Sequence, residues 1–131
     1  MGARHKARKR ALDVLFEADQ RQASVSDVLA ERSAHAQHPA NPYTVALVEG
    51  VVDHAVEIDQ LLETNAVGWT LDRMPAVDRA VLRLGTLELR WPPEEIASAV
   101  VIDEAVELAK ELSTDESPAF VNGVLGRIAA S

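Results

Sequence analysis

The sequence PAVDRAVLRLGTLELRWPP at residues 75–93 decides the class of fold. Its apolar side chains recur at intervals of three and four residues, which is the spacing of one buried face of an α-helix. Pro75 suits the start of a helix, and Trp91-Pro92-Pro93 ends it, because proline lacks the N–H that a helix interior requires. The apolar positions of this predicted helix are Val77, Ala80, Val81, Leu84 and Leu87.

The same spacing extends toward the N-terminus. It predicts a helix from about Lys6 to Gln20 and a second helix that ends near His35. Ser24 and Asp27 resemble a capping box at the start of the second helix. Two prolines in residues 37–42 predict a loop, and one long helix is predicted from there to Asn65. Its expected buried stripe is Val45, Val48, Val52, Ala55, Ile58 and Leu62.

The segment after residue 93 is harder to assign. Residues 100–102 are β-branched and would suit a strand. A helix is favoured, because the apolar stripe continues from Val101 through Leu108 and a lone strand would lack a partner. Ser117 and Pro118 have the pattern of an N-cap followed by a first-turn proline. The chain is therefore predicted to be all-α, with six or seven helices.

The charge distribution divides the chain into a basic arm, residues 1–10, and an acidic body. The net charge is −8, yet residues 4–10 hold five of the 13 Lys and Arg residues and no acid. Such asymmetry indicates that the arm has a task of its own. No segment has the length of a membrane span or the pattern of a secretion signal, so we expect a cytoplasmic protein without a membrane partner.

The residues that enzymes and metal sites require are missing. The absence of cysteine excludes disulfides and thiolate ligands, and no phosphate-binding, dinucleotide-binding, nucleophile-elbow or zinc-protease motif occurs. His35 and His38 lack further ligands nearby, so we expect no metal, no cofactor and no catalysis. The acidic pairs Glu49/Asp53 and Glu104/Glu107 are predicted to form a solvated surface. Four glycines within the predicted helices are assigned to close helix packing: Gly50, Gly85, Gly123 and Gly126.

The basic arm is typical of a nucleic-acid contact. Arg4 and Arg8 are four residues apart and share a helix face, while Lys6, Lys9 and Arg10 spread charge around the same turns. An acidic body repels a duplex, so a short single-stranded RNA is the better ligand. The alternative is a solubilising terminus that binds nothing. Phe120 near the start of the last helix could stack on a base or pack in the core, and Phe16 is equally ambiguous.

Several stretches resemble the NusB family, and together they cover essentially the whole chain. They are RKRALDVLFE at 8–17, VDRAVLRL at 77–84, IDEAVELAK at 102–110, DES at 115–117 and FVNGVL at 120–125. The stretch GWTLDR at 68–73 is similar to actinobacterial members. The resemblance implies two packed three-helix subdomains, approximately residues 4–66 and 67–131, within one domain that spans residues 1–131.

The resemblance also implies a function. NusB-like proteins bind the boxA element of nascent RNA together with NusE, a small-subunit ribosomal protein, and help RNA polymerase resist termination on ribosomal RNA operons. The implied RNA-binding residues are Arg4, His5, Lys6, Arg8, Glu116 and Phe120, and Lys9 and Arg10 extend the same basic run. Asp78 and Phe16 are implied to face the protein partner. His5 stands where the family often has arginine, so its charge depends on pH.

Two other functions remain open at this point. NusB-like domains also dock RNA in ribosomal RNA cytosine methyltransferases, but such an enzyme needs a further catalytic α/β domain that these 131 residues do not contain. A purely structural helical scaffold would leave the arm without a task. The sequence also leaves open whether the chain forms a homodimer and whether it binds RNA without the protein partner.

Overall fold

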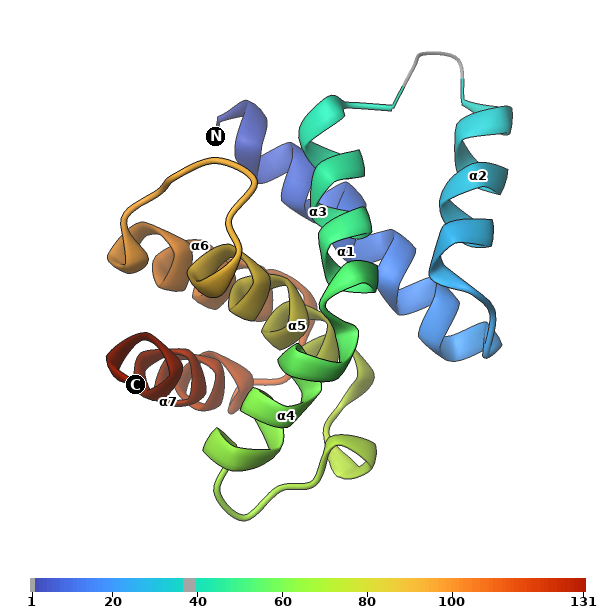
Figure 1. Cartoon of the computed structure of the whole chain (residues 1–131). Helices are drawn as coiled ribbons and strands as arrows, with labels where there is room; N and C mark the ends of the chain where they lie inside the picture. Colours follow the sequence, from blue (N-terminus) through green and yellow to red (C-terminus); the bar gives the residue numbers. More distant parts are fainter. Residues whose placement is uncertain (1, 37–39) are drawn as a thin grey trace.

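The computed structural model describes residues 2–36 and 40–131, and every regular element within them is a helix (Figure 1). This confirms the predicted all-α class. The elements are α1 (Ala3–Arg21), α2 (Val25–His35), α3 (Pro42–Asp53), α4 (Ala55–Asn65), a 3-10 turn η1 (Leu71–Arg73), α5 (Ala76–Arg90), α6 (Ser98–Leu112) and α7 (Ser117–Ala130).

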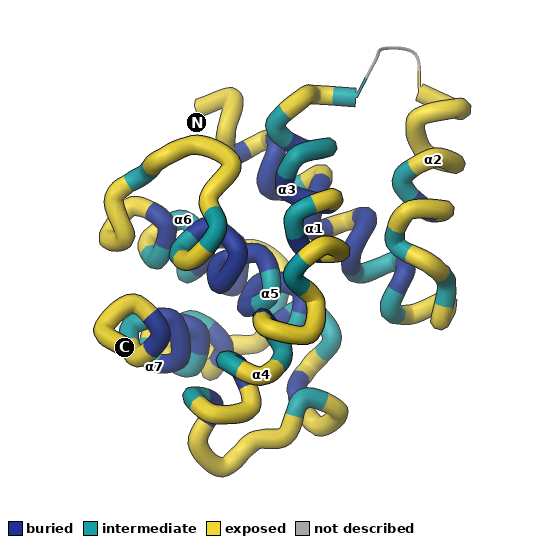
Figure 2. The backbone as a smooth tube through the Cα atoms, in the orientation of Figure 1, coloured by how far each residue is buried: buried dark blue, intermediate teal, exposed yellow. Residues whose placement is uncertain are grey.

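Helix α5 is the centre of the molecule. It packs against α1, α3, α4, α6 and α7, and the dark blue of Figure 2 marks it as buried along most of its length. Four of the five apolar residues predicted for its buried face are at most 3% exposed, and Val77 is half-buried. The core therefore forms around the segment whose periodicity is clearest in the sequence.

The other helices form two groups around α5. Helix α1 packs against α2 and α3, while α6 and α7 pack against each other and against α5. Helix α4 contacts α5 and α7, although the predicted boundary at residue 66 assigns it to the first subdomain. The division into 4–66 and 67–131 stays a prediction.

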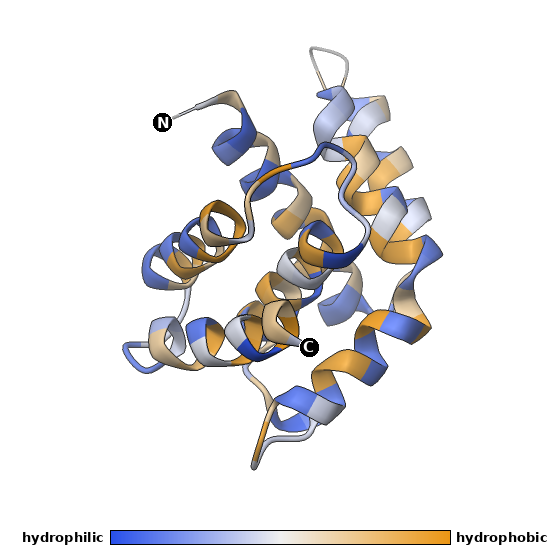
Figure 3. Cartoon of the chain, turned by 60° about the vertical axis from the view of Figure 1, so that its left-hand side comes forward, coloured by the Kyte–Doolittle hydropathy of each residue, from blue (hydrophilic) through white to orange (hydrophobic). Residues whose placement is uncertain are grey.

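Each helix is amphipathic, as the alternation of blue and orange around the ribbons of Figure 3 shows. The first turns of α1 are an exception, being largely hydrophilic (Figure 3). Helix α2 is the least buried, since Val28 is its one fully covered residue. Among the described residues, no helix has both the length and the apolar character needed to cross a membrane.

The prediction of a single long helix from Pro42 to Asn65 is wrong, because the helix is interrupted at His54. There the backbone leaves helical geometry, with φ −112° and ψ 21°, and the imidazole stacks on Trp91 with ring centroids 4.4 Å apart. The predicted buried stripe is correct for Val48, Ile58 and Leu62, which are at most 1% exposed. It is wrong for Val52, which is 41% exposed, and for Ala55, which is exposed. Helix α3 also buries Thr44, Leu47 and Val51.

Local signals predicted the start of α2 correctly and the start of α7 to within one residue. The Ser24 hydroxyl accepts from the Asp27 N–H at 3.4 Å, which confirms the cap. Residues 100–102 lie in α6, as favoured. Ser117 is the first residue of α7 rather than its N-cap, and its hydroxyl accepts from the Thr114 N–H. The predicted loop at 37–42 falls partly outside the described residues.

The glycine assignment is correct for two of the four positions. A Cβ at Gly50 would lie 2.8 Å from a terminal carbon of Leu87, and one at Gly85 would lie 2.7 Å from Leu125. These glycines allow α3 and α7 to approach α5. The assignment is wrong for Gly126, where a Cβ would meet nothing within 4 Å, and for Gly123, where it would meet only Arg127 at 3.6 Å.

Candidate nucleic-acid interface

The basic arm forms the first turns of α1, and helical geometry sorts its side chains into rows. Residues four apart on a helix lie one above the other. The six basic side chains therefore form three rows of two: Arg4 with Arg8, His5 with Lys9, and Lys6 with Arg10. Each row has a different environment.

The first row faces α5 and the loop that follows it. Arg8 is only 3% exposed, and its Nε and Nη2 each donate to a carboxylate oxygen of Glu88 at 2.8 Å. Burial opposes the charge of Arg8, but the hydrogen bonds and charge of Glu88 outweigh it and raise the pKa of Arg8. Arg4, in contrast, is exposed and pairs with Glu94 at 2.9 Å. Arg8 thus anchors the arm, while Arg4 stays accessible.

The second row faces α6. His5 is buried, with Nδ1 2.7 Å from Glu104 and Nε2 3.2 Å from Glu111. Only the protonated imidazole carries two N–H groups and can donate to both carboxylates. Lys9 lies 3.2 Å from Glu111, and its hydrogen bond lowers the pKa of that carboxyl. The prediction of a solvated acidic surface is therefore wrong for Glu104, which is half-buried against His5.

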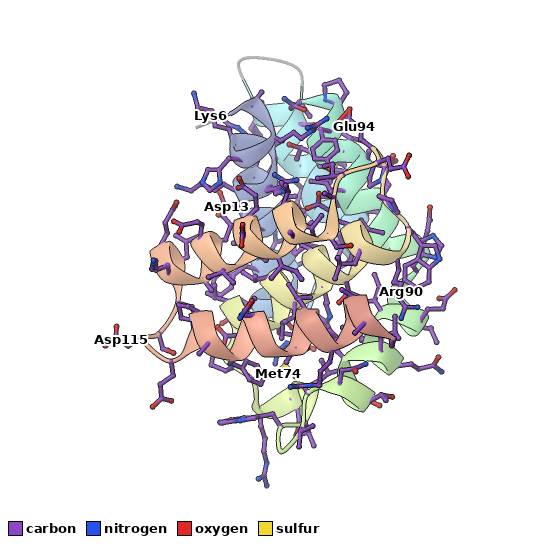
Figure 4. All side chains as sticks on the ribbon, turned by 90° about the vertical axis from the view of Figure 1, so that its left-hand side faces the viewer. Lys6, Asp13, Met74, Arg90, Glu94 and Asp115 are labelled. Atoms are coloured by element: carbon purple, nitrogen blue, oxygen red, sulfur yellow. The ribbon has the colours of Figure 1, made fainter. Side chains whose placement is uncertain are left out.

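The third row faces solvent. Lys6 and Arg10 are both exposed, and no carboxylate among the described residues lies within ion-pair distance of either. Figure 4 shows Lys6 at the outer edge of the molecule. A phosphate could approach these two cations without first displacing a carboxylate.

The single tyrosine of the chain, Tyr43, contacts the same carboxylate as Arg8. The Tyr43 hydroxyl donates to Glu88 at 2.7 Å, and burial together with that bond raises the pKa of Tyr43 well above its ordinary value. A phenol with a raised pKa in the folded state stabilises the fold below its unfolded pKa, and that stabilisation is lost as pH rises through the folded pKa.

We expect an ultraviolet absorbance titration of Tyr43 to show a folded midpoint above about 10. The same titration in denaturant should return to that ordinary value. A folded midpoint at or below it would contradict the bond between Tyr43 and Glu88.

The start of α7 lies on the same side of the molecule as the arm. In Figure 4, Lys6 and Asp115 lie along one edge with the C-terminal end of α6 between them. Glu116 is exposed at the N-cap of α7. Phe120 is half-buried, packs against the core, and has its ring 6.2 Å from that of Trp69. The arm and the start of α7 thus lie on one side of the molecule, with the end of α6 between them.

The two residues predicted to contact a protein partner differ in accessibility. Asp78 is 3% exposed and accepts from the Ser113 hydroxyl, which in turn accepts from Ser117 at 3.0 Å. This chain of bonds ties α5 to the loop between α6 and α7. Phe16 is half-buried on α1. Their role toward a partner stays a prediction.

The sequence did not reveal which carboxylates hold the arm. Glu88, Glu104 and Glu111 are 80 to 106 residues from their arm partners. The seven-residue spacing of Glu104 and Glu111 does place them on one face of α6, which was an available signal. Among the described residues, no group of three or more histidine, aspartate or glutamate side chains could hold a metal ion.

Comparison with known sequences connects this arrangement to one family. Residues 5–130 match the sequence model of the NusB family. The chain is 62% identical over 130 residues to the transcription antitermination protein NusB of Saccharopolyspora erythraea, and the match covers 98% of this chain and 88% of that relative. The protein of the same name from an Arthrobacter species is 57% identical over 128 residues, covering 98% and 93%.

Solved structures show the same fold. The NusB of T. maritima superposes with a TM-score of 0.87 at 33% identity, covering 99% of this chain and 92% of that one. A second neighbour comes from a crystal structure of the antitermination factors NusB and NusE in complex with double-stranded RNA. It has a TM-score of 0.81 at 30% identity, and the match covers 98% of both chains.

Proposed function

This chain belongs to the NusB family, and on that premise we propose that it is a non-enzymatic adaptor in transcription antitermination. It binds boxA-type RNA of nascent ribosomal transcripts together with the NusE ribosomal protein, so that RNA polymerase resists termination. This role assigns the protein to the cytoplasm, where transcripts are made. Similarity along 88% and 93% of two antitermination proteins favours it over the RNA-docking domain of a cytosine methyltransferase.

The observation that carries the proposal is the outward row of the arm. Lys6 and Arg10 form no ion pair with the described residues, and they lie on a helix that carboxylates of α5 and α6 hold in place. A rigid helix presents its cations without the entropy loss that ordering a free tail requires. The exposed head groups of Arg4 and Lys9 flank this row.

The two buried arm residues position the arm, and the two partly exposed ones can still reach phosphate. Arg8 and His5 are buried against Glu88 and Glu104, so their contribution to RNA binding is to fix the orientation of the arm. Phosphate can compete with Glu94 for Arg4 and with Glu111 for Lys9, because these two pairs are partly exposed.

The double variant Lys6→Ala/Arg10→Ala tests the proposal. We expect it to weaken binding of a single-stranded boxA-type RNA in fluorescence anisotropy, with and without the NusE-type protein. The slope of log affinity against log salt is negative, and each lost phosphate contact on a single strand reduces its magnitude by about 0.7. Loss of both cations should therefore reduce the magnitude by about 1.4.

The matched control is Arg21→Ala/Arg32→Ala, which removes the same charge from a cluster with Glu17 and Glu31. It should bind RNA with the salt slope of the wild type. A duplex of the same sequence is a useful second probe, since the solved complex contains double-stranded RNA. Absence of RNA binding by folded wild-type protein, alone and with the partner, would refute the proposed function.

A further inference from the structure

The loop between α4 and η1 places an exposed tryptophan beside α7. Gly68 adopts a positive φ of +85°, and the Trp69 N–H then donates to the Ala66 carbonyl at 3.1 Å. This turn sets the indole edge-on to Phe120, with the ring planes at 61°. Trp69 nevertheless remains 48% exposed, so the contact with Phe120 leaves much of the indole surface open to solvent.

A continuous strip extends from this pair along α7. Phe120, Gly123 and Arg127 are three and seven residues apart and therefore lie on one face of the helix. Glycine leaves an open gap between the other two, since a Cβ there would meet only the Arg127 guanidinium. We call Trp69, Phe120, Gly123 and Arg127 the α7 strip.

Arg127 is oriented toward the loop that carries the tryptophan. Its Nε donates to the Asn65 carbonyl at 2.8 Å, at the end of α4. Within residues 2–36 and 40–131, no carboxylate lies within ion-pair distance of Arg127. One N–H is thus used for orientation, and the charge of the guanidinium is not neutralised by an ion pair.

Aromatic rings beside unpaired cations are the components of single-stranded nucleic-acid sites. We propose that the α7 strip binds one nucleotide of single-stranded RNA, with its base stacked on Trp69 and a phosphate at Arg127. The inference rests on the proposed function, because it extends the RNA surface from the arm past the start of α7. Asp115 and Glu116 repel phosphate at that start, so the base lies at the aromatic end of the strip.

The chain contains a second tryptophan that serves as a control. Trp91 is half-buried and stacks on His54, away from the strip. In Trp91→Phe, Trp69 is the sole tryptophan, and titration with a single-stranded boxA-type RNA should quench its fluorescence. In Trp69→Phe, the fluorescence of Trp91 should stay constant during the same titration.

Affinity measurements give an independent result. Stacking on an aromatic side chain contributes about 1–3 kcal/mol per base, so Trp69→Ala should weaken binding about 5- to 150-fold. A series of RNA probes in which each nucleotide in turn is made abasic identifies the stacked base. For the probe that lacks that base, Trp69→Ala and the wild type should bind equally well. Arg127→Gln should reduce the salt slope, whereas Arg90→Gln should not. Arg90 donates to the Ile128 carbonyl at the end of α7 opposite Asp115, outside the strip (Figure 4).

The outcomes separate this inference from the proposed function. If wild-type protein binds RNA but Trp69 is neither quenched nor needed, the inference alone is overturned. If Trp69→Ala impairs only capture of the NusE-type protein, the strip is a protein contact and the inference is likewise overturned. If wild-type protein binds no RNA, both fail. Circular dichroism of each variant establishes that it is folded, and the fluorescence experiment does not depend on Trp69→Ala.

Discussion

Arg8→Ala is expected to lower the free energy of unfolding by about 3–5 kcal/mol, because it leaves the carboxylate of Glu88 buried without a partner. Both side chains are only 3% exposed, and two hydrogen bonds of 2.8 Å join them. A buried charge cannot regain its lost hydration, so removing one partner costs more than the pair contributes. Urea unfolding followed by circular dichroism measures the difference.

Two further variants make this prediction specific. Arg4→Ala removes an exposed pair of similar length and should cost at most about 1 kcal/mol. Arg8→Met/Glu88→Gln removes both charges and keeps an oxygen that accepts from Tyr43, so it should recover most of the stability. Equal costs for Arg8→Ala and Arg4→Ala would contradict the buried pair.

The same double variant tests how Arg8 affects RNA binding. If Arg8 only positions the arm, Arg8→Met/Glu88→Gln should bind boxA-type RNA about as well as the wild type. A loss of affinity together with a smaller salt slope in this folded variant would show that Arg8 itself contacts phosphate.

The second large effect is expected at the crossing of α3 and α5. Leu87 is fully buried, and Leu87→Ala should lower the free energy of unfolding by about 2–5 kcal/mol through lost burial and the cavity left behind. Gly50→Ala alone should also destabilise, by up to about 3 kcal/mol, because its Cβ would lie within 3 Å of both terminal carbons of Leu87. Thermal and urea unfolding of the single variants measure both costs.

The effects of Gly50→Ala and Leu87→Ala on the free energy of unfolding should not be additive. Once Leu87 is alanine, a Cβ at position 50 meets no terminal carbons, and alanine is favoured over glycine in a helix by about 1 kcal/mol. Gly50→Ala should therefore become stabilising in that background. Gly126→Ala, whose Cβ would meet nothing within 4 Å, should be mildly stabilising in both backgrounds. A cost of Gly50→Ala that is unchanged by Leu87→Ala would contradict the close approach.

Much of the fold could be predicted because the position of a helix depends mainly on residues that are close together in the sequence. Periodicity identified α1 and α5, and short-range signals located the ends of α2 and α5. The break at His54 was missed, since neither glycine nor proline marks it and a regular apolar stripe can be drawn through it. The contact found at the break, the stacking of His54 on Trp91, joins residues 37 positions apart.

Charge and helical pitch are local properties, so the sequence alone predicts a basic, helical arm whose cations lie four residues apart in rows. Which of these side chains are buried depends on the packing of α1 against the other helices. Arg8 meets Glu88, His5 meets Glu104, and Lys6 and Arg10 are left facing solvent. The physical reason is that burial of a charge depends on carboxylates brought near by packing α1 against α5 and α6, and periodicity along one helix contains no information about its neighbours.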